Sequence, residues 1–259
     1  MKQTDVKKLL KSLGFRPLKS LGQNFLIEDG LCDYIANQIT TAPDDFWLEI
    51  GPGLGALTRK LLSRNGVKLT AIELDHGLCK YLRSEFAENE VFELIEGDAV
   101  KEIATIDQIS VVAGNLPYNI STPLLVEILN RQQLPEEIVF TLQKETGERF
   151  CARSKTKAYG AITVLLQSCY HVECRRSLNH EVFYPQPNVD SVVFYGKKKG
   201  DALAPDLRIP FYKLLRAAFA QRRKKLRNTI GLDSDLRPEH LSVNEWKQAF
   251  LTHHSKASL

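Results

Sequence analysis

A short apolar run followed by a glycine-rich turn constrains this chain of 259 residues most strongly. Phe46–Ile50 predicts a buried strand, and Gly51-Pro52-Gly53-Leu54-Gly55 follows directly, before a helix predicted over Ala56–Arg64. Glycines let the backbone of such a turn approach a ligand closely, and the start of the helix presents unpaired N–H groups. This order of strand, glycine turn and helix is typical of α/β folds that bind a cofactor.

Further apolar runs alternate with helical patterns, which predicts a mostly parallel sheet. Besides the first strand, we expect strands over 67–72, 91–95, 109–113, 138–142, 170–176 and 191–195. One further helix is expected before the first strand, over 28–40, and others between the strands, over 123–130, 144–152 and 159–167. The sequence therefore predicts an α/β fold built on a seven-stranded sheet.

The pattern changes after the polar, glycine-containing stretch Lys197–Asp201, which is typical of a linker. Beyond it we expect helices over 210–220 and 222–230, then short segments from Pro238 and Val243. We therefore predict an α/β domain over residues 1–200 and a small all-α domain over residues 201–259.

Positive charge is concentrated in two segments, although the formal net charge is only +4. Residues 1–20 contain six Lys or Arg and one acidic residue, and residues 1–13 predict an amphipathic helix. Residues 207–228 contain eight Lys or Arg and no Asp or Glu. Such a stripe suits a polyanion such as RNA, although a single basic run is more often a solvated face. The candidate RNA-binding residues are Arg222, Arg223, Lys224, Lys225 and Arg227.

Cysteine usage and hydropathy indicate the compartment. Five cysteines without a Cys-x-x-Cys pair favour reduced thiols and a cytoplasmic protein. Cys169-x-His171-x-x-Cys174 is a weak zinc pattern in a β-like run, and we expect no metal. No apolar run approaches the roughly 18 residues of a membrane span, and the amphipathic N-terminus lacks the apolar core of a signal peptide. We expect no membrane association.

Acidic residues follow two further strands of the predicted sheet. Glu73 lies about twenty residues past the first glycine, where a carboxylate can bind ribose hydroxyls. Asp98 follows the next strand and can accept a hydrogen bond from an adenine amino group. Each acid alone is equally well explained as a helix cap or a surface charge. Together with the turn, whose Gly-x-Gly-x-Gly spacing differs from that of dinucleotide sites, they predict an adenosine-shaped pocket.

The stretch Asn115-Leu116-Pro117-Tyr118 follows the 109–113 strand and offers acceptors for a planar amine. Asn115 carries an amide oxygen, and Pro117 biases Leu116 toward an extended conformation that can turn its carbonyl outward. Tyr118 adds a flat ring, and Phe183, which opens a proline-containing loop, is the candidate for a second stacking ring. The alternative reading is an ordinary turn with core aromatic residues.

Several motifs in this order resemble the ribosomal RNA adenine N6-dimethyltransferase family, over residues 14 to 250. The bacterial small-subunit branch is the most similar. The motifs are Gly22-Gln23-Asn24-Phe25-Leu26, Glu49-Ile50-Gly51-Pro52-Gly53-Leu54-Gly55, Ile72-Glu73-Leu74-Asp75, Gly97-Asp98-Ala99, Asn115 to Thr122, Phe183 to Ser191, and Phe219 to Asn228.

The resemblance implies a Rossmann-like class I methyltransferase sheet and S-adenosylmethionine as methyl donor, with S-adenosylhomocysteine as product and no metal. It implies a monomer that dimethylates two adjacent adenines in the 3′-terminal hairpin of 16S rRNA, within the 30S subunit during its maturation. The implied catalytic residues are Asn115, Leu116, Tyr118 and Phe183. The implied donor contacts are Asn24, Leu26, Gly51, Gly53, Glu73, Asp98 and Asn115.

Three alternatives remain at this point. The first is a 23S rRNA adenine methyltransferase of the macrolide-resistance type. Leu116 disfavours it, because that branch is expected to carry Ile at this position. The second is a non-catalytic ribosome assembly factor with a vestigial pocket, which the complete set of motifs disfavours. The third is a nicotinamide-dependent oxidoreductase, which the glycine spacing disfavours.

Overall fold

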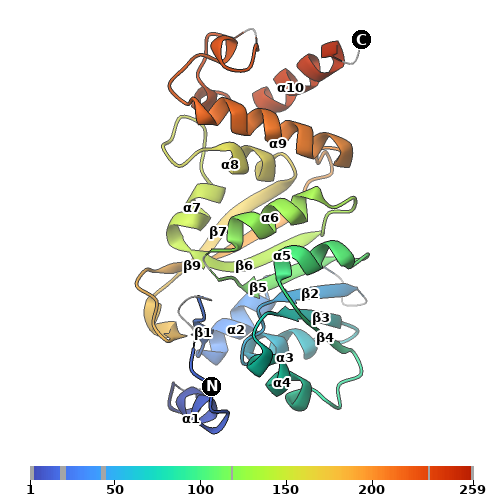
Figure 1. The fold of residues 1–259 in the computed structure, drawn as a ribbon, viewed down its shortest axis with the longest axis vertical. Helices are drawn as coiled ribbons and strands as arrows, with labels where there is room; N and C mark the ends of the chain where they lie inside the picture. Colours follow the sequence, from blue (N-terminus) through green and yellow to red (C-terminus); the bar gives the residue numbers. More distant parts are fainter. Residues whose placement is uncertain (1–2, 18–21, 42–44, 118, 233, 258–259) are drawn as a thin grey trace.

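A computed structural model describes residues 3–17, 22–41, 45–117, 119–232 and 234–257 and contains a seven-stranded sheet (Figure 1). The strand order is β4-β3-β2-β5-β6-β9-β7, in which β9 runs antiparallel to both neighbours and the other pairs are parallel. The predicted α/β class and sheet are confirmed. The strands are β2 (Phe46–Ile50), β3 (Lys68–Glu73), β4 (Phe92–Glu96), β5 (Val111–Asn115), β6 (Glu137–Gln143), β7 (Tyr170–Leu178) and β9 (Ser191–Lys198).

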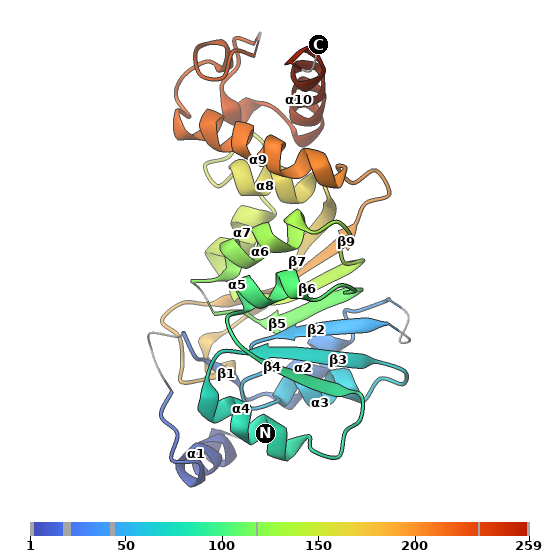
Figure 2. The same cartoon turned by 45° about the vertical axis from the view of Figure 1, so that its right-hand side comes forward.

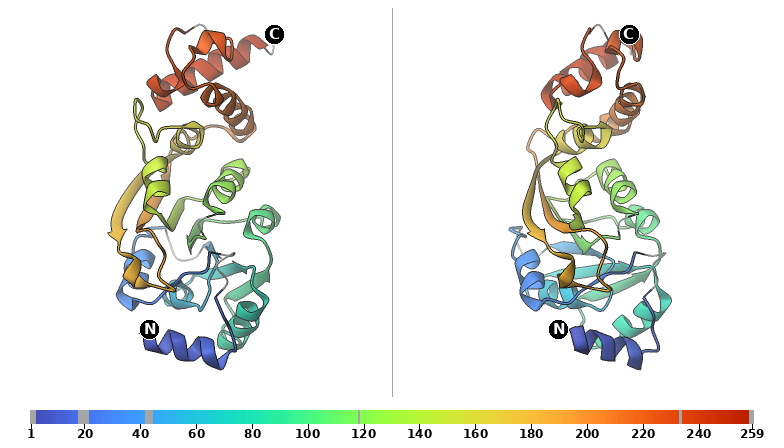
Figure 3. Two further views of the ribbon diagram at one scale, coloured as in Figure 1. Left: turned by 60° about the vertical axis from the view of Figure 1, so that its left-hand side comes forward. Right: turned by 90° about the vertical axis from the view of Figure 1, so that its left-hand side faces the viewer.

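Helices cover both faces of this sheet (Figure 3). Alternate strand residues point to opposite faces, so Leu48 and Trp47 enter two different apolar clusters. The Leu48 cluster includes residues of α5 to α10, and the Trp47 cluster includes α2 and α3. The helices are α1 (Gln3–Ser12), α2 (Asp29–Ala36), α3 (Ala56–Leu62), α4 (His76–Glu85), α5 (Ala99–Glu102), α6 (Ser121–Asn130), α7 (Lys144–Phe150), α8 (Ala161–Gln167), α9 (Pro205–Ala220) and α10 (Val243–Ala257).

Two short strands, neither of which is among those expected from the sequence, form a separate antiparallel pair. In this pair, β1 (Phe25–Leu26) lies beside β8 (Phe183–Tyr184), with Phe25 opposite Tyr184 and Leu26 opposite Phe183. The Ile27 N–H also donates to the carbonyl of Val182. Segments more than 150 residues apart in sequence are thus joined by backbone hydrogen bonds.

The predicted amphipathic N-terminal helix is present as α1. Its buried side chains, Val6 and Leu10, pack in a third apolar cluster with Phe25, Leu54 and Leu78. This places α1 beside β1 and α4, whereas α9 and α10 lie at the other end of the molecule (Figures 1 and 2).

The helix predicted to start at Pro210 begins earlier, at Pro205. Proline fits the first position of a helix because the N–H there has no partner within the helix. Pro210 then lies inside α9 and removes one internal hydrogen bond. Phe211 and Leu215 are fully buried, so packing against the core holds the helix despite this loss.

The helix predicted over 222–230 is wrong, because only the 3-10 turn η4 (Leu226–Asn228) forms there. The N–H groups of Leu226 and Arg227 donate to the carbonyls of Leu236 and Ser234, which fixes this segment against a neighbouring loop. The predicted linker is also shorter at its start, since Lys197 and Lys198 end β9. One apolar cluster contains residues from both sides of residue 200, and the division into two domains stays a prediction.

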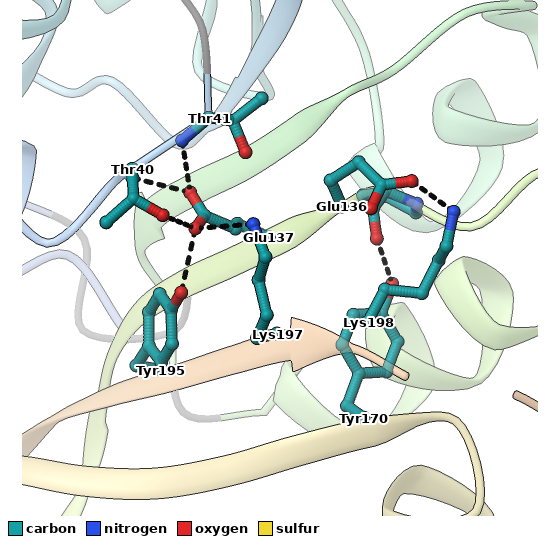
Figure 4. Close-up of polar contacts among 9 residues, drawn as sticks. Thr40, Thr41, Glu136, Glu137, Tyr170, Tyr195, Lys197 and Lys198 are labelled. Atoms are coloured by element: carbon teal, nitrogen blue, oxygen red, sulfur yellow. Dashed lines mark hydrogen bonds and ion pairs between the residues drawn. The ribbon is translucent and has the colours of Figure 1, made fainter. Parts of the chain in front are cut away.

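Glu137, at the amino end of β6, is fully buried and fixes the connection between α2 and β2 (Figure 4). Its carboxylate accepts from the Thr40 and Thr41 N–H groups at 2.7 and 3.0 Å and from the Thr40 hydroxyl. It also accepts from the Tyr195 hydroxyl at 2.7 Å and from the Lys197 ammonium at 3.0 Å. Burial alone would raise the pKa of Glu137, but these donors outweigh it and lower the pKa to about 2.

Candidate functional site

A pocket lies at the carboxyl ends of β2, β3, β4 and β5, where an open α/β sheet binds its ligands. Segment 22–26 closes one side of the pocket. All of the predicted donor contacts line it: Asn24, Leu26, Gly51, Gly53, Glu73, Asp98 and Asn115. Residues separated by up to 91 positions in the sequence are therefore brought to one cavity.

The glycine turn has the backbone geometry that glycine alone adopts readily. Gly51, Gly53 and Gly55 have φ angles of 65°, 59° and 73°. A Cβ on Gly53 would lie only 2.9 Å from the ring of Phe25. The missing side chain thus lets β1 approach the turn and keeps the wall of the pocket close to the backbone.

Glu73 is 7% exposed and ends β3. One carboxylate oxygen accepts from the Gly53 N–H at 3.1 Å, and the other accepts from the Leu74 and Asp75 N–H groups at 2.9 and 3.0 Å. Burial raises the pKa of Glu73, while these three donors act in the opposite direction. The contacts fix the carboxylate at the pocket wall, and the oxygen that accepts from Gly53 retains a lone pair that can accept from a hydroxyl group.

Two more acidic residues line the pocket, and they differ in their hydrogen bonds. Asp98 caps α5, with its Oδ1 accepting from the Val100 N–H at 3.0 Å. Glu49 is 1% exposed, and among the described residues its Oε2 has no hydrogen-bond partner. Burial raises the pKa of Glu49 to about 8, and the nearby Glu73 adds to the rise. Glu49 is thus a buried carboxyl group whose hydrogen-bonding capacity the protein does not use fully.

Asn115 ends β5 and is held by the opposite wall of the pocket. Its Nδ2 donates to the backbone carbonyl of Asn24 at 2.6 Å. This hydrogen bond fixes which amide atom is the nitrogen, so Oδ1 is the remaining acceptor. Among the described residues no donor reaches that oxygen, and the group expected to accept from a ligand is therefore available.

The other predicted catalytic residues lie differently. Leu116 has a 2% exposed side chain, and its N–H donates to the Thr141 carbonyl, so its role rests on its own carbonyl. Tyr118 lies outside the described residues. Phe183 is 1% exposed and packs in an apolar cluster with Leu26 rather than lining the pocket. For stacking on a base, the Phe183 ring would have to leave that cluster.

Most of the predicted RNA-binding side chains contact other parts of the chain. Arg222 donates to the carbonyls of Thr156 and Lys157, both at 2.7 Å, and lies 3.6 Å from the Glu239 carboxylate. Lys225 and Arg227 both pair with Asp235, at 3.0 and 2.9 Å. For Arg223 and Lys224, no ion pair forms with another described residue.

Some pocket residues have no role in the sequence analysis. Gln23 lines the pocket and donates to the Asp75 carboxylate at 3.2 Å, and Asp75 in turn caps α4. Asn119 and Ile120 line the side next to Asn115. All lie within motifs quoted above, so the motifs located them, but nothing in their residue type indicated a contact.

Two absences hold for the described ranges. There, no helix combines the length and the apolar character that crossing a membrane requires. In the same ranges, no three His, Cys, Asp or Glu side chains gather as a metal site would need.

Comparisons with known proteins agree on one family. Residues 14–246 match the family described as "Ribosomal RNA adenine dimethylase". The chain is 36% identical to a Ribosomal RNA small subunit methyltransferase A from Clostridium acetobutylicum, over 95% of this chain and 97% of that protein. It is 40% identical to a protein of the same name from Thiobacillus denitrificans, over 89% of this chain and 95% of that protein.

Two solved structures share the fold. The crystal structure of a dimethyladenosine transferase from Plasmodium falciparum superimposes with a TM-score of 0.78 at 23% identity, covering 90% of this chain and 98% of that one. The structure of the 23S rRNA methyltransferase ErmE gives a TM-score of 0.66 at 21% identity, with coverage of 88% and 98%.

Proposed function

The chain belongs to the ribosomal RNA adenine dimethylase family, and we propose that it dimethylates N6 of two adjacent adenines in the 3′-terminal hairpin of 16S rRNA. The small subunit is favoured over 23S rRNA because relatives of 36 and 40% identity carry small-subunit names, whereas ErmE shares only the fold. The proposed substrate is the 30S particle during its maturation, the proposed compartment the cytoplasm and the proposed state a monomer.

The residues of the pocket fit S-adenosylmethionine as the donor. Glu73 would accept from the ribose hydroxyls, and Asp98 from the adenine amino group through its second oxygen. The glycine turn, Asn24 and Leu26 would contact the rest of the donor molecule. Glu49 supports this fit, because a buried carboxyl group without a full set of partners suits a ligand that brings polar groups. When bound, the donor supplies an electrophilic methyl group on a sulfonium ion.

Asn115 is the residue on which the proposed chemistry depends most. The target nitrogen is a weak nucleophile because its lone pair is delocalised into the purine ring. Asn115 Oδ1 and the Leu116 carbonyl would accept hydrogen bonds from the two N–H groups of this amine. These hydrogen bonds would favour a pyramidal nitrogen whose lone pair is free to attack the methyl group. Alignment and fixed dipoles then supply much of the barrier reduction. The hydrogen bond from Asn115 to Asn24 is the observation that supports this role.

Neither a catalytic base nor a metal is required in this proposal. After transfer the nitrogen is cationic and can lose its proton to water. Tyr118 and Phe183 would stack on the adenine after it leaves the RNA stack, and stacking would offset an unstacking cost of a few kcal/mol. For Phe183 this requires rotation of a buried ring.

The test is methyl transfer to 30S subunits isolated from a strain that lacks the modification. With a tritium-labelled donor, we expect the label on two adjacent adenines of the 3′-terminal hairpin, with two methyl groups on each. Transfer to protein-free 23S RNA instead would contradict the proposed substrate. Tight donor binding in calorimetry without any transfer would identify a non-catalytic assembly factor.

A further inference from the structure

The helix α1 carries a lysine face for which the proposed chemistry has no use. Lys7, Lys8 and Lys11 are exposed, and Lys11 lies four positions after Lys7 and three after Lys8, on the same side of the helix. The opposite side carries the buried Val6 and Leu10. The apolar side anchors the helix, so its fold does not depend on Lys8 and Lys11.

The position of α1 relates this face to the pocket. Val6 and Leu10 pack against Phe25, Leu54 and Leu78, and these three residues all line the pocket. The helix therefore lies directly behind the pocket wall. In the ribbon it lies beside β1 and α4, at the end of the molecule far from α9 and α10 (Figures 1 and 2).

Lys7 also connects α1 to the loop that the sequence analysis assigned to the target base. Its ammonium lies 5.4 Å from the centroid of the Tyr184 ring. Tyr184 is the last residue of β8, and the 185–190 loop follows it. The carbonyl of Asp190, at the end of that loop, accepts from the Lys144 N–H beside β6. Lys7 thus lies beside the strand that leads into this loop.

The charges of α1 are more available than those of the 222–227 segment. Within the described ranges, neither Lys8 nor Lys11 forms an ion pair, whereas Arg222, Lys225 and Arg227 all contact acidic groups or carbonyls. An ammonium group without a partner can neutralise a phosphate without first breaking an internal contact.

We propose that the lysine face of α1 (Lys7, Lys8 and Lys11) binds phosphates of the rRNA strand next to the target adenine. The inference rests on the proposed function, since it names a second contact surface for the same substrate. Phosphate is the favoured partner because the face is cationic and polar, whereas a protein partner would need buried apolar contacts that this side of α1 lacks.

The test compares two double variants of the full chain with the same loss of charge. Lys8→Gln/Lys11→Gln removes two charges from the face. Lys68→Gln/Lys101→Gln removes two exposed lysines that lie outside both basic segments, one at the start of β3 and one in α5. Binding to protein-free 16S rRNA and to 30S subunits is measured across a salt series, together with donor affinity and the rate at saturating rRNA.

We expect the α1 variant alone to bind rRNA more weakly, with a salt slope lower by about two, because each phosphate contact contributes about one. Donor affinity and saturated rate should stay at the wild-type level, and Lys8→Arg/Lys11→Arg should restore binding. Equal rRNA binding by the two Gln variants would overturn the inference. A loss of binding seen with 30S subunits but not with protein-free rRNA would also overturn it, because it would indicate a ribosomal protein as the partner of the lysine face. If the wild-type protein transferred no methyl group, the proposed function would be contradicted. The comparison of rRNA binding between the two Gln variants could still be interpreted.

Discussion

Asn115 lies at the carboxyl end of β5 and Glu137 at the amino end of the neighbouring strand β6, and they use their polar atoms in opposite ways. Glu137 accepts from five donors on four residues, and its pKa is held at about 2. Asn115 donates one hydrogen bond to Asn24, and its oxygen has no donor among the described residues. The saturated residue secures the fold, while the unsaturated one is left for a ligand.

The two basic regions repeat this contrast. In the 222–227 segment, three of the five candidate side chains use their charge in contacts with other parts of the chain. On α1 the lysines lie on the exposed side of a helix anchored by apolar contacts. The density of charge in a sequence therefore does not rank surfaces for binding, because availability depends on the partners within the fold.

Asn115→Ala should give the largest effect, on the rate alone. We expect the single-turnover rate at saturating donor and rRNA to fall about 10²–10³-fold, as for loss of one group that stabilises a transition state. The affinity for rRNA and the melting temperature should change little, because few internal contacts depend on this side chain. A rate near that of the wild type would contradict the claim that Asn115, unlike Glu137, serves the reaction rather than the fold.

Glu137→Gln should affect stability and leave the saturated rate unchanged. The folded pKa of about 2 lies below the ordinary value of 4.5, so the carboxylate stabilises the fold above pH 4.5 and loses this effect as the pH falls toward 2. We expect the variant to lose about 3 kcal/mol of unfolding free energy at pH 7. Denaturant unfolding should show the difference from the wild type shrinking below pH 4.5; a constant difference would contradict the assigned cause.

Arg222→Ala should separate structural from RNA-binding arginines. Loss of two charge-assisted hydrogen bonds to the carbonyls of Thr156 and Lys157 should lower the unfolding free energy by about 1–2 kcal/mol. The salt dependence of rRNA binding should not change. The control, Arg223→Ala/Lys224→Ala, should retain stability and lower the salt slope. The reverse outcome would restore Arg222 as an RNA contact.

Asp235→Asn should give the smallest effect, and in the opposite direction. It releases Lys225 and Arg227 from their ion pairs, which are exposed and contribute little to stability. We expect slightly tighter rRNA binding with a steeper salt slope, measured against the wild type in the same titration. Unchanged binding would indicate that these two cations do not face the rRNA.

The sequence was sufficient for the sheet and for most of the pocket because both depend on local signals. The strand Phe46–Ile50 was predicted with its observed bounds, and its glycine turn has the positive φ angles that its residues favour. Glu73 ends β3 and Asp98 lies two residues after β4, so the parallel pairing of these strands brings them together.

The remaining features depend on contacts between distant segments. The pairing of β1 with β8 and the burial of Phe183 link segments more than 150 residues apart, and neither has a signature within its own segment. The 222–230 segment reads as a helix, but hydrogen bonds to Ser234 and Leu236 displace that conformation. Tertiary contacts overrode local propensity there.

The most direct test of the central claim is a structure of the protein with S-adenosylhomocysteine and an adenine-containing fragment of the 16S hairpin. The account predicts the adenine N6 within about 2.7–3.2 Å of both Asn115 Oδ1 and the Leu116 carbonyl, with the donor sulfur in line behind it. An adenine amine that points away from these two oxygens, in a complex that still supports methylation, would contradict the account.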